Sequence, residues 1–186
     1  MKNLKLVTLD TVDRIVTPND FKKITLDSPA AEIFTDFKLF NPLMIEANTK
    51  AVDALHLMLK AHVHLKIVIS ESNDFVGVLS SYDVSEQRIM HRVALGHDRE
   101  EILVSDLMLP RNELMAFDIV ELENSTVNDV IEALKQNGLR HCLVMDSKNH
   151  HIRGIISSSD IARKLHIPIE ISSNVTFAKI FKAVNG

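Results

Sequence analysis

A seven-residue segment occurs twice in this chain, and this repeat constrains the fold more than any other feature of the sequence. Residues 77–83 read GVLSSYD, and residues 154–160 read GIISSSD. The two copies share the glycine, a Ser-Ser pair and the final aspartate, and they exchange one aliphatic residue for another at the second and third positions. Because the chain has only 5 glycines, two of them opening matched segments indicate a duplicated structural unit.

The residues before each segment predict the same order of elements: strand, helix, strand, strand. Apolar residues spaced three and four apart predict the helices, and short aliphatic runs are typical of strands that helices cover. The predicted ranges are 42–46, 49–61, 65–70 and 75–79 in the first copy, and 118–122, 126–137, 141–146 and 152–156 in the second. Thr49 and either Ser125 or Thr126 are candidate helix N-caps, and Gly138 is a candidate C-terminal glycine.

Two such copies are expected to fold together. Each has about 50 residues, a size at which one hydrophobic core alone is marginal. Packing the two sheets face to face about a pseudo-two-fold axis would bury both apolar faces at once. The sequence therefore predicts an α/β (α+β) fold of two tandem β-α-β-β-α repeats that form one cooperative unit.

The remaining segments fit around these repeats. A short helix is expected to start near Ser28 and end near Asp36, and Gly96 is expected to separate two charged linker helices within residues 84–109. A closing helix is expected at residues 174–184. The resulting division is an N-terminal arm (1–27), a first repeat with a linker helix (28–96), a second repeat (97–173) and a C-terminal helix (174–186).

Composition excludes several classes of protein. The 186 residues are 46% hydrophobic and 25% charged, as in a globular domain rather than a disordered chain. A net charge of −4 argues against coating nucleic acid or an anionic membrane, and no apolar run reaches the roughly 18 residues of a membrane span. The start of the chain does not read as a secretory signal, and the single Cys142 excludes an internal disulfide or a multi-cysteine zinc site. We therefore expect a cytoplasmic protein.

The repeated unit resembles a known family. Two β-α-β-β-α units, each ending in glycine, two aliphatics, serine, two variable residues and aspartate, are similar to a pair of CBS (cystathionine beta-synthase) domains, also called a Bateman module. The resemblance covers roughly residues 28–166. Residues 103–108 (LVSDLM), followed by Pro110 and Arg111, are similar to the segment that often introduces a CBS repeat.

The resemblance implies a regulatory module rather than an enzyme. CBS pairs commonly bind adenosine-containing ligands (AMP, ADP, ATP or S-adenosylmethionine) in clefts between the repeats, and they commonly associate into disc-like dimers. We therefore expect an adenine nucleotide as a regulatory ligand, no required cofactor, a homodimer and an unidentified protein partner. No nucleophile elbow, phosphate-binding glycine loop or dinucleotide fingerprint points to catalysis.

The matched serines and aspartates also suit a nucleotide on chemical grounds. A helix is expected to begin near Ser81 with Asp83 in its first turn, and unpaired amides at such a start favour phosphate. An aspartate accepts hydrogen bonds from two ribose hydroxyls, and neighbouring aliphatic side chains would form a slot for the base. The predicted ligand-binding residues of this type are Ser80, Asp83, Ser157 and Asp160, with Leu79 and Ile156 as the apolar slot.

Basic residues just before the third element of each repeat are candidates to bind phosphate. They are Arg140 and His141 in the second repeat, and His64 and Lys66 in the first. Arg140 is the strongest of them because a guanidinium binds phosphate with two parallel hydrogen bonds. For Lys66, projection from the strand entrance into water is the better interpretation.

Three alternatives remain open at this point. Ser-x-x-Asp at a helix start is also a capping box, which satisfies backbone donors without any ligand. The chain could therefore be a ligand-free scaffold for dimerisation or partner docking. The 9 histidines could form a metal site, but they show no metal-ligand spacing, so scattered surface histidines are the better interpretation and no metal is expected.

Overall fold

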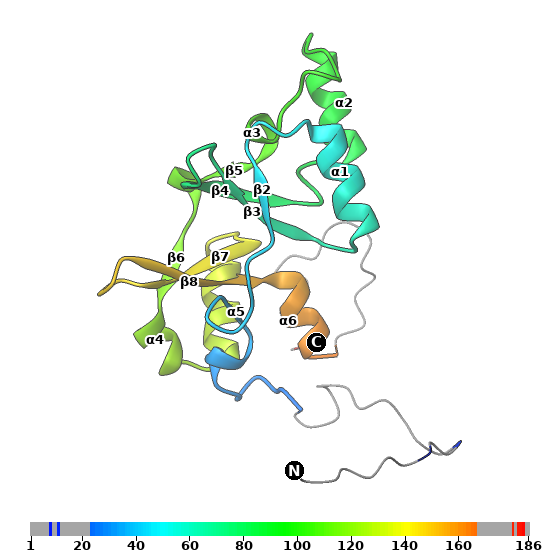
Figure 1. Cartoon of the computed structure of the whole chain (residues 1–186). Coiled ribbons are helices and arrows are strands. Elements are labelled where there is room, and N and C mark those ends of the chain that lie inside the picture. The colour runs from blue at the N-terminus through cyan, green and yellow to red at the C-terminus, as the bar shows by residue number, and fades with distance from the viewer. Residues whose placement is uncertain (1–7, 9–10, 12–22, 167–179, 181, 185–186) are drawn as a thin grey trace.

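Two four-stranded sheets lie face to face, and helices cover the outer side of each (Figure 1). The computed structural model describes residues 8, 11, 23–166, 180 and 182–184. The strand order is β2-β3-β4-β5 in the first sheet and β1-β8-β7-β6 in the second. The predicted α/β fold of two tandem repeats is confirmed.

The two halves share the order strand, helix, strand, strand, helix, and each adds one short helix (α3 in the first half, α4 in the second). In the first half these are β2 (Met44–Glu46), α1 (Ala51–Lys60), β3 (Leu65–Ile69), β4 (Phe75–Ser80), α2 (Glu86–Ala94) and α3 (Val104–Leu107). In the second they are β6 (Ala116–Asp118), α4 (Ile119–Glu123), α5 (Val127–Gln136), β7 (His141–Asp146), β8 (His151–Ser157) and α6 (Ser158–Lys164). In both halves the first strand pairs parallel to the second, and the second pairs antiparallel to the third.

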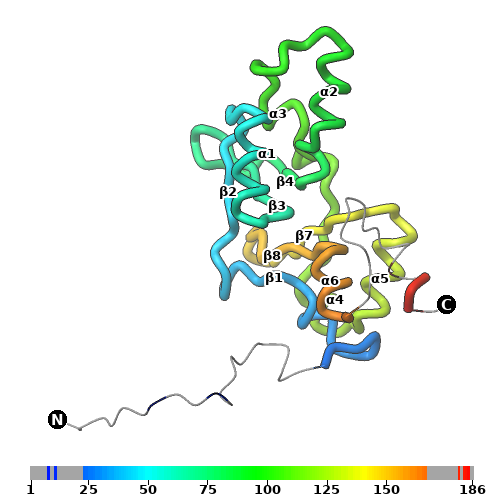
Figure 2. Tube along the Cα trace, turned by 90° about the vertical axis from the view of Figure 1, so that its right-hand side faces the viewer, coloured from blue at the N-terminus to red at the C-terminus, as the bar shows by residue number. Residues whose placement is uncertain are grey.

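Each half also contributes a two-residue strand to the sheet of the other half. β1 (Thr35–Asp36) is the first strand of the first half but pairs with β8 of the second sheet. β5 (Leu109–Pro110) is the first strand of the second half but pairs with β4 of the first sheet. The chain therefore passes between the halves at both places, as the trace in Figure 2 shows.

This exchange explains the repeated glycine. A Cβ atom at Gly154 would lie 2.3 Å from the carbonyl oxygen of Thr35 in β1. A Cβ atom at Gly77 would lie 2.5 Å from the carbonyl oxygen of Leu109 in β5. Only glycine lets the exchanged backbone approach this closely. The glycine repeated in the sequence is therefore the residue against which the exchanged strand packs.

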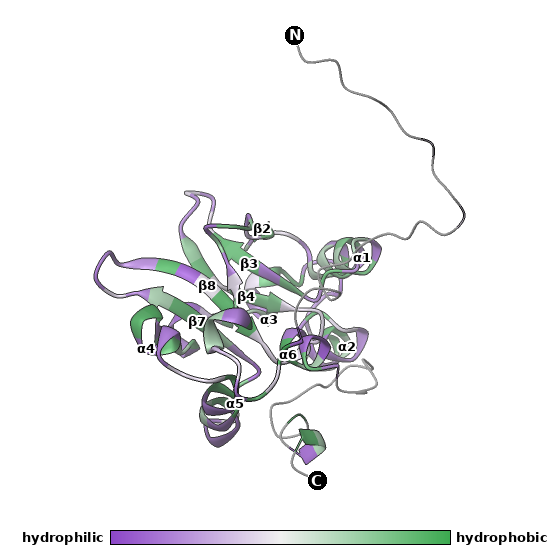
Figure 3. Ribbon diagram, turned by 90° about the horizontal axis from the view of Figure 1, so that it is seen from below, coloured by the Kyte–Doolittle hydropathy of each residue, from purple (hydrophilic) through white to green (hydrophobic). Residues whose placement is uncertain are grey.

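The buried side chains form three clusters. The cluster between the sheets is built on Ile67, Val78, Leu143 and Ile155. The other two clusters lie between each sheet and its helices. In Figure 3 the helices carry both green and purple residues, as expected of elements with one buried and one exposed face.

One predicted strand is wrong. Residues 118–122 were expected to be extended, but the strand β6 ends at Asp118 and the helix α4 follows it at once. Asp118 is the N-cap of α4, because its Oδ1 accepts a hydrogen bond from the Val120 amide at 2.9 Å. Ile119 and Leu122 are buried on one face of this short helix, a spacing of three that also suits a helix.

The helix expected to begin near Ser81 is also displaced. Residues 81–84 form a turn, and α2 begins at Glu86 with Ser85 as its N-cap. The cause is local, since the Asp83 carboxylate accepts hydrogen bonds from the Ser80 amide at 2.9 Å and the Ser80 hydroxyl at 2.6 Å. These bonds close a turn of their own before a helix can start.

The segment around Ser28 forms less helix than predicted. It contains only the 3-10 helix Ala30–Glu32, and Thr35 and Asp36 belong to β1. Most of the predicted closing helix lies outside the described residues, although residues 180 and 182–184 are helical. Ile180 is fully buried in the core of the second half.

The predicted helix ends are confirmed in part. Thr126 is the N-cap of α5 and forms a capping box with Asp129, but α1 has Lys50 rather than Thr49 at this position. Gly138 follows the end of α5 with a φ of +64°, and Gly96 lies between α2 and α3 with a φ of +96°. Among the described residues, no helix has the length and apolar character needed to cross a membrane.

An ion pair ties β1 to the second sheet, and its removal should weaken the fold. Arg153 Nε donates to Asp36 Oδ1 at 2.8 Å and Nη2 donates to Oδ2 at 2.6 Å, with side chains only 19% and 14% exposed. The hydrogen bonds from Arg153 hold the pKa of Asp36 below its usual range. Asp36→Asn should therefore lower the free energy of unfolding at pH 7 by about 1–3 kcal/mol in urea titrations.

The pH dependence of this loss follows from the sign of the pKa shift. The stabilisation is complete above about pH 4, the ordinary pKa of aspartate, and disappears as the pH falls through the lowered pKa. Wild type and Asp36→Asn should thus converge in stability on acidification. Glu86→Gln, which removes the exposed pair between Glu86 and Arg99, is the control and should have a smaller effect at pH 7. Equal effects of the two substitutions would contradict this role of Asp36.

Candidate functional site

The second matched segment ends where the two halves meet. Ser157 is the last residue of β8 and the N-cap of α6, so α6 starts directly after the strand. This continuity puts Ser159 and Asp160 on the first turn of the helix. Ser157 and Asp160, both predicted ligand-binding residues, therefore lie close together at the junction.

A cavity of about 580 Å³ opens at this junction and is lined by both halves. The second half contributes Ile155, Ser157, Ser159, Asp160, Ala162 and Arg163. The first half and the segment that leads into it contribute Thr35, Phe37, Phe40, Asn41, Pro42, Leu43, His62, Val63, His64, Leu65 and Ile67. The volume is within the range of small-molecule sites in proteins.

The lining divides into an apolar and a polar part. Phe37, Phe40 and Leu43 come from the segment between β1 and β2, and Phe40 remains 62% exposed. Two histidines, His62 and His64, come from the turn between α1 and β3. An aromatic side chain this exposed at a cavity suits contact with a flat ligand.

Asp160, in the first turn of α6, forms an ion pair with Arg163, in the last turn of the same helix. The Asp160 side chain is 29% exposed and that of Arg163 is 70% exposed. The pair thus offers the cavity a carboxylate that accepts hydrogen bonds and a guanidinium that donates them. It is an exposed, adaptable pair rather than a buried one, so a ligand can rearrange it at small cost.

The first matched segment has a different environment. Its Asp83 is bound by Ser80, as described above, which is the local capping arrangement that the sequence left open. The guanidinium of Arg140 lies over the ring of Tyr82, 4.3 Å from the ring centroid. None of these four residues lines the 580 Å³ cavity.

His141 lies beside Asp83 and Arg140. Its ring Nδ1 is buried and has no hydrogen-bond partner among the described residues. Burial lowers the pKa of His141 to about 4, with the Arg140 charge acting in the same direction and the Asp83 charge opposing it. His141 is therefore neutral at pH 7, and it does not serve there as the cation expected from the sequence.

The predicted apolar slot is not where the cavity lies. Leu79 and Ile156 are fully buried, each in the cluster between its sheet and the covering helices. Their neighbours Val78 and Ile155 point to the opposite face, between the sheets, and Ile155 lines the cavity. Lys66 also lies outside the lining, and its Nζ is 3.4 Å from the Met44 carbonyl oxygen.

Several lining residues were not predicted from the sequence. Arg163 follows Asp160 by three residues, so the helical period could have placed both on one face. Phe37 and Phe40 follow a strand of only two residues, and no local pattern brings them to the second repeat. Only the pairing of β1 with β8 brings these two side chains to the second repeat.

The other chemical groups singled out in the sequence do not gather into a site. Within the described ranges, no three His, Cys, Asp or Glu side chains cluster so that they could hold a metal ion. Cys142 is buried, and burial raises the pKa of its thiol to about 12. It packs as a small apolar side chain in the core of the second half.

The fold and the cavity together define a class of protein: a tandem α/β repeat with a cavity between its halves. The family model of the CBS domain matches residues 30–89 and 104–167. The chain belongs to the CBS-domain family, as its repeated segments predicted. Proteins built from CBS pairs are generally regulatory. Comparison with curated protein sequences gave no match.

Several solved structures share this fold. An uncharacterized conserved protein from Pyrococcus horikoshii is 19% identical with a TM-score of 0.56, over 80% of this chain and 100% of that one. A CBS-domain protein of unknown function from Thermoplasma acidophilum is 22% identical with a TM-score of 0.51, over 81% and 76%. The CBS domain of a bacterial CNNM/CorC family Mg²⁺ transporter, solved in complex with ATP, is 19% identical with a TM-score of 0.53, over 76% and 89%.

The environment of His141 predicts its titration. Its imidazole signals in a carbon-edited NMR spectrum should stay unchanged from pH 8 to pH 5.5, and they should begin to shift only near the lowered pKa of about 4. His141→Gln identifies the signals, and the ring of the same residue in the chain unfolded in urea is the control. Titration of His141 between pH 8 and pH 5.5 in the folded protein would show that its ring is solvated. Because the unfolded chain takes up a proton near pH 6.5, this group should also destabilise the fold as the pH falls from about 6.5 to 4.

Proposed function

We propose that this protein is a regulatory module that binds an adenine nucleotide in the cavity between its two halves. The observation that carries the proposal is the cavity lining. It joins aromatic and aliphatic side chains from one half to a carboxylate, a guanidinium and two serine hydroxyls from the other. A nucleotide needs each of these: an apolar slot for the base, an acceptor for the sugar and donors for the phosphates.

Each part of the nucleotide has a candidate partner. The base would lie against Phe37 and Phe40, and the ribose hydroxyls would donate to Asp160. Arg163, His62 and His64 would donate to the phosphates. Of the residues predicted from sequence, this assignment keeps Ser157, Asp160 and His64, and it replaces Arg140 with Arg163 as the main phosphate ligand.

A relative supports the ligand class. The CBS domain of the Mg²⁺ transporter was solved with ATP, and it shares the fold of this chain. The likeness in fold makes an adenine nucleotide the first ligand to test, and the residues named above are the reason to test it in this cavity.

The bound state would act on other proteins rather than on a substrate. The described helices α1 and α2 cover the same sheet and carry exposed apolar side chains: Leu57, Leu59, Met90 and Leu95, between 48% and 63% exposed. These faces suit a second copy of the chain or an unidentified protein partner. A homodimer whose packing responds to the nucleotide is the proposed output, and we propose that the module acts in the cytoplasm.

Thermal unfolding tests the proposal directly. The probes are AMP, ADP, ATP and S-adenosylmethionine, and at least one should raise the midpoint, since a ligand at 100 times its Kd stabilises the folded state by about 2.7 kcal/mol. Asp160→Asn should weaken binding of that nucleotide about tenfold to a hundredfold through loss of the ribose acceptor. Asp129→Asn is the matched control, because Asp129 caps α5 and lies outside the cavity.

Two outcomes would overturn the proposal. The first is a midpoint that none of the four probes changes, with calorimetric titration also silent. The second is equal nucleotide binding by Asp160→Asn and wild type. Sedimentation velocity distinguishes the nucleotide-responsive module from a ligand-free scaffold. A scaffold would form dimers or larger assemblies to the same extent with and without nucleotide.

A further inference from the structure

The two halves place equivalent residues at equivalent positions, so their clefts can be compared residue by residue. The matched segments align Ser80 with Ser157, Asp83 with Asp160 and Tyr82 with Ser159. The backbone aligns Arg140 with His64, because the Ser81 amide donates to the His64 carbonyl at 2.9 Å and the Ser158 amide donates to the Arg140 carbonyl at 3.2 Å. The second cleft is therefore the region around Tyr82, Asp83, Arg140 and His141.

The residues that line the first cleft have counterparts in the second cleft that contact each other. Ser159 and His64 line the cavity, whereas their counterparts Tyr82 and Arg140 stack on each other across the halves, with 4.3 Å from guanidinium to ring centroid. A guanidinium held over an aromatic ring at this distance is a favourable cation–π contact. Both Tyr82 and Arg140 are partly shielded from solvent.

The aromatic wall of the first cleft has no counterpart in the second. Phe37 and Phe40 belong to the seven residues between β1 and β2. The equivalent segment between β5 and β6 has only five residues, RNELM at 111–115, and three of them form the 3-10 helix Arg111–Glu113. A base in the second cleft would therefore lack these two aromatic contacts.

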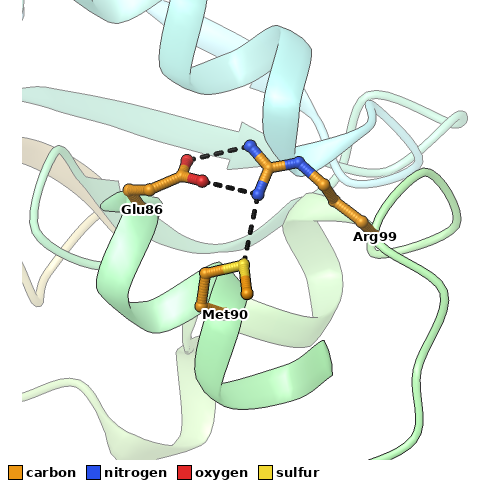
Figure 4. A network of polar contacts seen from close by, with 3 residues as sticks. All are labelled: Glu86, Met90 and Arg99. Atoms are coloured by element: carbon orange, nitrogen blue, oxygen red, sulfur yellow. Dashed lines mark hydrogen bonds and ion pairs between the residues drawn. The ribbon is translucent and has the colours of Figure 1, made fainter. Parts of the chain in front are cut away.

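The charges also differ. Arg163, three residues after Asp160, lines the first cleft, and the equivalent residue after Asp83 is Glu86. Figure 4 shows the Glu86 carboxylate held by Arg99, whose two Nη atoms donate at 2.6 and 2.9 Å. The first half thus has an acid, already paired, at the sequence position where the second matched segment is followed by a guanidinium. Its Asp83 is already bound by Ser80.

From these differences we infer that the stacked pair Tyr82–Arg140 closes the second cleft, so that each chain binds one nucleotide, at Asp160 alone. The stoichiometry rests on the proposed function, but the closure by Tyr82 and Arg140 does not. The pair makes the two equivalent clefts of the duplicated fold different, and it confines ligand binding to the cleft at Asp160.

The closure can be tested without any ligand. Tyr82 is the single tyrosine and the chain has no tryptophan. The tyrosine fluorescence of the protein therefore reports on this ring. Arg140→Ala should raise the acrylamide quenching constant of Tyr82 about twofold, because the guanidinium no longer covers one face of the ring. Arg140→Lys keeps a cation without the flat cover and should give an intermediate value. The control Arg163→Ala, in the open cleft, should leave the quenching constant unchanged.

The stoichiometry is tested by calorimetric titration with ATP. Wild type should bind one ATP per chain, and saturation should leave the Tyr82 emission unchanged. Asp83→Asn should bind ATP as wild type does, whereas Asp160→Asn should bind it about tenfold or more weakly. Two ATP per chain, or weaker binding by Asp83→Asn than by Asp160→Asn, would overturn the inference.

The two proposals fail in different ways. If ATP and the other probes do not bind, the proposed function fails, and the quenching constants still decide whether Arg140 covers Tyr82. If ATP binds but Arg140→Ala leaves quenching of Tyr82 unchanged, the nucleotide-binding function stands and the closure of the second cleft is refuted.

Discussion

The exchange of the two short strands is the constraint on which the rest of this structure depends. β1 and β5 have two residues each, yet each joins a half of the molecule to the sheet of the other half. The close backbone contacts at Gly77 and Gly154 permit this pairing, and the ion pair of Asp36 with Arg153 fixes one side of it. Two marginal cores thereby become parts of one folded unit.

The exchange also creates the cavity. Thr35 and Phe37 reach the end of β8 only because the chain runs through the second sheet before it enters the first. The segment after β1 then crosses back and brings Phe40 and Leu43 over the junction. The cavity is thus a consequence of how the halves are connected, and neither repeat contains it alone.

Duplication of the backbone does not impose duplication of function. Ser80 and Asp83 occupy the same place in their half as Ser157 and Asp160 do in theirs, but Ser80 binds Asp83 and delays the start of the next helix. In the second half, α6 follows β8 without a turn. A few side chains, chiefly Tyr82 and Arg140, give two related clefts different properties.

The sequence predicts the fold well where its signals are periodic or repeated. The matched glycine and aspartate identify the duplication, and the apolar spacing identifies α1 and α5 within one or two residues of their ends.

Hydrophobic patterns in the sequence do not predict the structure where an element is too short or where a strand is buried on both faces. Two residues carry no period, so β1 and β5 are not visible in the sequence. Val78 and Leu79 are both fully buried, so hydrophobicity alone does not show which of them faces the other sheet. For the same reason the sequence predicts Ile156 as part of an apolar slot, whereas it is Ile155 that lines the cavity, together with His64, Ser157 and Asp160.

Differential scanning calorimetry tests the central claim that strand exchange makes the two halves one unit. The account predicts a single unfolding transition whose calorimetric and van't Hoff enthalpies agree, since neither sheet can unfold without losing a strand that belongs to the other half. Two resolved transitions, or a van't Hoff enthalpy well below the calorimetric one, would show that the halves unfold separately and would contradict the account.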